Sequence, residues 1–144
     1  MEINQVTQNY TYQWWRWPLL PFASIIVAMV GSTLMGFFLR GIFWLQEKQG
    51  GVDLDSWYHP FALYVIPAGV FGYLYAHIAC AMAPRGKVIA GTVMVTILGI
   101  VTALAISNYW LSSEKSIKIS LLFTIAGFAS IISSIVVLVK VDRK

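Results

Sequence analysis

Residues 58–82 read YHPFALYVIPAGVFGYLYAHIACAM and contain no Asp, Glu, Lys or Arg. An α-helix rises about 1.5 Å per residue, so about 20 apolar residues cross the hydrocarbon core of a bilayer. The run also holds both histidines, the only cysteine and Pro67. We therefore predict a membrane-spanning helix here, and we expect any chemistry of the chain to lie in it.

Three further apolar runs, at residues 19–45, 88–110 and 117–139, flank this one. Only 11% of the 144 residues are charged and 58% are hydrophobic, whereas about 25% are charged in a typical soluble domain. A chain this short cannot bury that much apolar surface in a core of its own, and no segment alternates with the period of two of a strand. We predict an all-α, polytopic integral membrane protein, a single membrane domain over residues 1–144 with four transmembrane helices in a compact bundle.

Residues 1–17 are polar and aromatic, and we predict a cytoplasmic or interfacial segment that leads into the first span. The alternative is a signal peptide, but the apolar run is too long, lacks a small-residue cleavage site and is not preceded by a basic segment. All six tryptophans fall at predicted span ends, as in the aromatic belts of membrane proteins. They are Trp14, Trp15, Trp17, Trp44, Trp57 and Trp110.

The distribution of Lys and Arg predicts the orientation. With four spans, both termini and the loop between the second and third spans share one side, and that side carries Arg16, Arg85, Lys87, Lys140, Arg143 and Lys144. The other side carries Arg40, Lys48, Lys115 and Lys118, together with four of the six acids. The positive-inside rule places the more basic side in the cytoplasm. We expect a bacterial cytoplasmic (inner) membrane location with both termini cytoplasmic.

Small side chains recur every four residues in each predicted span. Residues four apart share one face of a helix, and small side chains there let two helix backbones approach closely. We predict that these rows pack the spans against one another or against other copies of the chain. They are Ser24, Ala28, Ser32 and Gly36; Ala68, Gly72 and Ala76; Gly91, Gly99 and Ala103; and Ser130 and Ser134.

Tyr64, Tyr73, Tyr75 and His77 bring polar atoms into the second span. Tyrosine hydroxyls inside a membrane need hydrogen-bond partners. They either line a small polar cavity, such as a quinone or lipid pocket, or bond to neighbouring helices, and the sequence leaves both interpretations open.

The sequence offers few candidate residues for catalysis or metal binding. His59 and His77 are 18 residues apart on one helix, about 27 Å by helix rise, so they cannot ligate the same haem. Asp53, Asp55 and His59 are close enough in sequence for a metal site, but a solvated acidic loop is the simpler interpretation. Cys80 lies in apolar sequence as a packing thiol. We expect no catalytic residue, no metal and no cofactor.

Few polar groups in the spans, close-packing rows and a basic cytoplasmic face favour a non-catalytic subunit of a larger membrane assembly. Arg85, Lys87, Arg143 and Lys144 are the candidate contacts for a cytoplasmic partner or for anionic lipid headgroups. Such a subunit would anchor its partner or signal to it, as in defence or immunity systems. We expect membrane lipids and other subunits or copies of the chain as partners, and no nucleic acid.

The alternative is a homo-oligomeric small channel or carrier. Four spans are few for a complete pathway, so several copies would be needed. Pro67 and Gly72 would then break the second helix, and this break would line the pathway.

Overall fold

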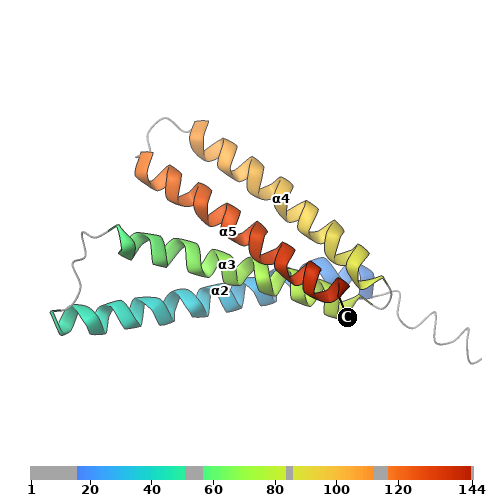
Figure 1. The fold of residues 1–144 in the computed structure, drawn as a ribbon, viewed down its shortest axis with the longest axis horizontal. Helices are drawn as coiled ribbons and strands as arrows, with labels where there is room; N and C mark the ends of the chain where they lie inside the picture. Colours follow the sequence, from blue (N-terminus) through green and yellow to red (C-terminus); the bar gives the residue numbers. More distant parts are fainter. Residues whose placement is uncertain (1–15, 51–56, 84–85, 112–116, 144) are drawn as a thin grey trace, which may run out of the picture.

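The computed structural model is helical throughout the residues that it describes, which are 16–50, 57–83, 86–111 and 117–143 (Figure 1). Its helices are α2 (Arg16–Lys48), α3 (Tyr58–Met82), α4 (Lys87–Leu111) and α5 (Ile117–Asp142). All four are long and apolar enough to cross a membrane. The prediction of an all-α chain with four helices of spanning length is confirmed. Residues 1–15 and 51–56, which include Asp53 and Asp55, lie outside the described residues.

Each helix covers the apolar run from which it was predicted or extends beyond that run. The helix α3 covers the same residues as the quoted run, and α2 extends about a turn past residues 19–45 through Arg16 at its start and Lys48 at its end. Charged residues extend a helix at little cost where its ends reach polar surroundings. The expected break in the second span is absent, because α3 continues as one α-helix through Pro67 and Gly72.

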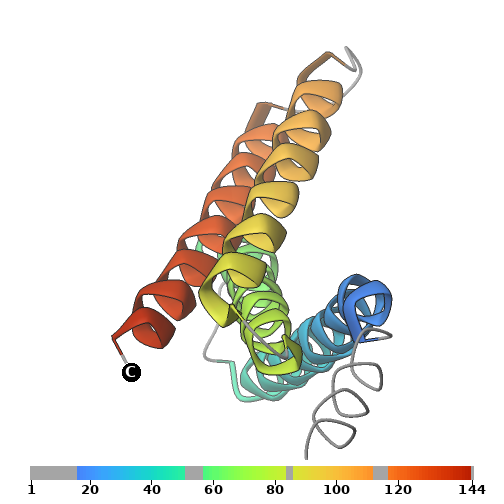
Figure 2. The ribbon, with the colours of Figure 1, turned by 90° about the vertical axis from the view of Figure 1, so that its right-hand side faces the viewer.

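The helices form two antiparallel pairs, α2 with α3 and α4 with α5, that meet at one end and diverge toward the other (Figures 1 and 2). The start of α2, the end of α3, the start of α4 and the end of α5 all lie at the end that we call the closed end. Figure 2 shows them spread across this end, with the start of α2 and the end of α5 on opposite sides. At the opposite, open end the two pairs are separated. The central helix is α3, which packs against all three others and most extensively against α5 and α2.

The buried side chains explain this shape. The largest core cluster joins α2, α3 and α4 near the closed end and is built mainly from alanines, with Leu20, Tyr75 and Met94. A second cluster, Ala76, Val95 and Val137, joins α3, α4 and α5. Toward the open end, the buried cluster connects α2 and α3 alone, without a residue from α4 or α5. The structure therefore differs from a uniformly compact bundle: the two helix pairs share buried clusters toward the closed end, and toward the open end only α2 and α3 do.

The helices α3 and α5 cross at Gly72. A Cβ added to Gly72 would overlap the backbone of Ser130, so only glycine permits this approach. The Ser134 hydroxyl lies beside the crossing, 2.8 Å from the Gly72 carbonyl oxygen and 2.9 Å from that of Ser130, and can donate to either. This crossing connects the two helix pairs.

The predicted rows of small residues divide according to the same shape. Buried members cluster near the crossing and the closed end, and they are Ser24, Ala28, Gly72, Ala76, Gly91, Ser130 and Ser134. Ser32 and Ala68 are half-buried. Toward the open end, Gly36 and Gly99 have no neighbouring atom within 4 Å of an added Cβ, and Ala103 is exposed. Within the chain, the rows on α2 and α4 thus leave the helix contacts as the pairs diverge.

Candidate functional site

A cavity of about 510 Å³ lies between the two helix pairs, on the open side of the α3–α5 crossing. All four helices contribute to its lining, which includes no charged residue. Each helix contributes one hydroxyl-bearing residue to the lining, and the other lining residues are apolar. They are Ser32, Tyr64, Thr102 and Ser130. This arrangement suits an apolar ligand with few polar atoms.

Two phenylalanine rings in the cavity lining are held by a second ring. Phe71 stacks on Tyr75 with ring centres 6.0 Å apart and planes 12° apart. Phe123 stacks on Tyr109 at 4.8 Å and 19°. Stacked pairs of this kind are a favourable aromatic arrangement. The cavity lining therefore includes two phenylalanine rings that each contact a second aromatic ring.

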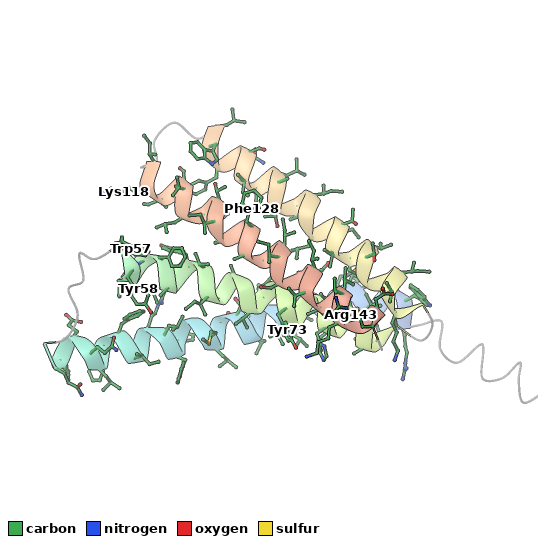
Figure 3. The ribbon with its side chains drawn as sticks, in the orientation of Figure 1. Trp57, Tyr58, Tyr73, Lys118, Phe128 and Arg143 are labelled. Atoms are coloured by element: carbon green, nitrogen blue, oxygen red, sulfur yellow. The ribbon has the colours of Figure 1, made fainter. Side chains whose placement is uncertain are left out.

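The four polar residues predicted for a cavity in the second span do not come together. Tyr64 lines the cavity, whereas Tyr75 is buried in the core, where its hydroxyl lies 3.9 Å from the Met94 sulfur. Tyr73 and His77 stack on each other at 5.9 Å on an exposed face of α3, and Figure 3 shows Tyr73 on the side away from α4. A single cavity formed by all four is therefore not what the structure contains.

Sequence reasoning did not assign Phe71, Phe123 and Ser130 to a cavity. Tyr64 and Phe71 are seven residues apart and so share a helix face, which was the available signal for Phe71. Ser130 was recognised only as a packing residue. Its place in the cavity lining depends on how α4 and α5 diverge from α3, which no local pattern encodes.

The closed end carries a second candidate site, made of cations. Arg16, Lys87, Lys140 and Arg143 are exposed and belong to the ends of α2, α4 and α5 that lie at this end, with the start of α2 on the opposite side from the end of α5 (Figure 2). Figure 3 shows Arg143 at this end and Lys118 at the open end. We call Arg16, Lys87, Lys140 and Arg143 the basic rim. Arg85 and Lys144, also predicted as contacts, lie outside the described residues.

The histidines and the cysteine have ordinary packing roles. The His59 ring lies against Phe43 with ring centres 4.6 Å apart, near the open end of α3. His77 belongs to the stacked pair on the exposed face, nearer the closed end. Cys80 is a buried free thiol. In the part of the chain that the structure describes, no three His, Cys, Asp or Glu side chains are grouped to hold a metal ion.

Comparison with known proteins gives no relative: no family model, no curated protein and no solved structure matches the chain.

Proposed function

We propose that this chain is a non-catalytic, membrane-embedded subunit that docks a partner of a larger membrane assembly through its basic rim. The observation that carries the proposal is that exposed cations of three helices lie at the same end of the molecule, the closed end. Both termini and this end face the cytoplasm in the proposed orientation, and the membrane is the bacterial cytoplasmic membrane. The partner presents an acidic surface, because that is the chemistry complementary to Lys and Arg.

The outer faces of the helices support the membrane part of the proposal. Large apolar side chains such as Phe22, Phe37 and Leu104 are 65%, 64% and 59% exposed, and comparable residues occur on every helix. Patches of this extent on a water-soluble monomer would drive aggregation. In a bilayer they contact lipid acyl chains, and the helical backbone leaves no polar group unpaired there.

The closed end supports the docking part. Packing between neighbouring helices at this end fixes the backbone that carries the cations, so less backbone entropy is lost when a partner binds. Each exposed ion pair between such a cation and an acidic group of the partner contributes about 0.2–1 kcal/mol. The attraction decays over about 8 Å at physiological ionic strength, so the partner has to lie close to the membrane surface.

The mass and composition of the particle extracted gently from native membranes test this function. We expect this chain together with a different polypeptide in a fixed ratio. A particle that contains copies of this chain alone, with no other polypeptide, would contradict the subunit proposal.

A second candidate function, a homo-oligomeric channel or carrier, has one observation in its favour. Pro67 and Ala68 lie in α3, the helix proposed to line the pathway of such a channel. Both residues line the cavity between the two helix pairs. Gly72 is packed against Ser130, so it belongs to the helix crossing and not to a pathway.

Replacing Pro67 by alanine tests this second candidate. The substitution restores one backbone hydrogen bond and removes ring atoms from the cavity wall. If the cavity is part of a pathway, we expect flux in reconstituted vesicles to change severalfold while membrane insertion is retained. Ser107→Ala, at an exposed position on α4 outside the cavity lining, is the control and should leave flux unchanged. Unchanged flux in Pro67→Ala would count against the pathway.

A further inference from the structure

Ser130 has an unusual environment for a hydroxyl in an apolar helix. The residue is only 6% exposed and lines the cavity, and its Oγ is the one buried side-chain oxygen or nitrogen in the described residues that has no hydrogen-bond partner. Ser24, Ser107 and Ser134, by contrast, each have the hydroxyl within hydrogen-bond distance of the carbonyl oxygen four residues earlier. An unpaired hydroxyl away from water costs free energy that a suitable ligand atom would recover.

The depth of Ser130 restricts what can pair with it. Ser130 is thirteen residues after Ile117 and twelve before Asp142, so it lies at the middle of α5. If α5 spans the bilayer, this is the midplane, about 15 Å from either edge of a hydrocarbon core about 30 Å thick. The ester carbonyls of bilayer lipids lie near those edges. An acyl chain that fills the cavity from the bilayer therefore brings methylene groups to Ser130 and no acceptor.

The cavity walls restrict the ligand further. Because no charged residue lines the cavity, a charged ligand would remain uncompensated in a low-dielectric site. Phe71, Phe123 and Tyr64 line the cavity, so aromatic rings are available to contact a flat ring in the ligand. The volume of about 510 Å³ falls within the range of about 300–1,000 Å³ that small-molecule sites occupy.

We propose that this cavity binds an uncharged apolar molecule whose ring carries a carbonyl oxygen, of the quinone type, and that this oxygen accepts a hydrogen bond from Ser130 Oγ. The Oγ is buried in the ligand-free structure, so this hydrogen bond requires Ser130 to change its χ1 rotamer and bring the Oγ to the cavity surface, which needs no movement of α5. The ring lies against the aromatic side chains of the lining, and an apolar tail extends toward the open end. The site stands apart from the basic rim and does not depend on partner docking.

The probe for the test is a decyl-substituted benzoquinone, added to the purified full-length chain in neutral detergent micelles. Binding is measured from the rise in melting temperature with probe concentration, and its stoichiometry by native mass spectrometry. Decylbenzene, which has the same tail and a ring without carbonyls, is the matched ligand control. We expect one benzoquinone per chain, bound about tenfold more tightly than decylbenzene, since one hydrogen bond distinguishes the two.

Ser130→Ala should lower the affinity for the benzoquinone about tenfold and leave that for decylbenzene unchanged. Ser107→Ala should change neither. Ala105→Phe, which adds a ring at an exposed position in the cavity lining, should abolish the binding of both probes without disturbing the α3–α5 crossing. Without ligand, Ser130→Ala should melt at or above the wild-type temperature, because an unpaired hydroxyl has been removed.

Three results would each overturn the proposal. Equal benzoquinone affinity of wild type and Ser130→Ala would show that the hydroxyl is not the donor. A lower melting temperature of ligand-free Ser130→Ala would show that the hydroxyl has a structural partner. Tighter, Ser130-dependent binding of dioctanoylglycerol than of the benzoquinone would show that the occupant is an ester lipid and not a ring.

Discussion

Replacing Gly72 by alanine should destabilise the folded bundle by about 1–3 kcal/mol, the usual cost of forcing an extra methyl group into a packed contact. The reason is geometric, since a Cβ at this position overlaps the Ser130 backbone and not a flexible side-chain end. The helices α3 and α5 must move apart, and the Ser134 hydroxyl then loses its approach to the Gly72 carbonyl. The measurement is the unfolding midpoint in mixed micelles of mild detergent and SDS, followed by circular dichroism.

Gly36→Ala and Gly99→Ala are matched controls for this substitution. Both glycines lie inside helices, and an added Cβ has no neighbour within 4 Å at either. Because alanine restricts the unfolded chain more than glycine does, these two variants should be neutral or more stable by up to about 1 kcal/mol. Equal stability of all three variants would contradict the close crossing of α3 and α5.

Neutralising Arg85, Lys87, Arg143 and Lys144 together, each to glutamine, should release the proposed partner. At up to about 1 kcal/mol for each cation, the four substitutions remove at most about 4 kcal/mol, which is up to about a thousandfold in the dissociation constant. The measurement is the amount of partner that copurifies from native membranes, compared at equal amounts of inserted chain. In the unaltered protein, raising the salt concentration should weaken the same association, since Lys87 and Arg143 are exposed.

The open end provides the control with the same number of charges. Neutralising Arg40, Lys48, Lys115 and Lys118 removes four cations from the opposite end of the predicted topology. We expect this variant to retain the partner. Retention of the partner by both quadruple variants would contradict docking through Arg85, Lys87, Arg143 and Lys144, and its loss from both would point to a general effect of charge on insertion.

The number, type and extent of the helices followed from the sequence because each depends on local composition. The run of 25 residues at 58–82 has one way to satisfy its backbone in an apolar environment, which is an α-helix. The helix α2 is longer than predicted because Arg16 and Lys48 end the apolar run without ending the helix. A hydropathy profile locates the positions where side chains change from apolar to polar, whereas backbone hydrogen bonds determine where a helix ends.

The sequence pattern does not predict that the two helix pairs diverge. The rows of small residues include Gly72 and Ser134, which meet at the crossing. They also include Gly36, where an added Cβ would have no neighbour within 4 Å, and Ala103, which is exposed. A row of small residues permits close approach, but whether a partner helix is present depends on the crossing angle and on the connections. For the same reason, the sequence pattern predicts a packing role for Ser130 and not a place in a cavity lining.

The accessibility of single cysteines in intact cells tests most directly whether the basic rim faces the cytoplasm. The chain suits this measurement because its only cysteine, Cys80, is buried. Asn4→Cys lies in the segment predicted to be cytoplasmic, and Gln49→Cys lies at the open end. With a membrane-impermeant maleimide, we predict labelling of Gln49→Cys in intact cells and labelling of Asn4→Cys only after permeabilisation. Labelling of Asn4→Cys in intact cells, with Gln49→Cys protected, would place the basic rim outside the cytoplasm and contradict the proposed docking function.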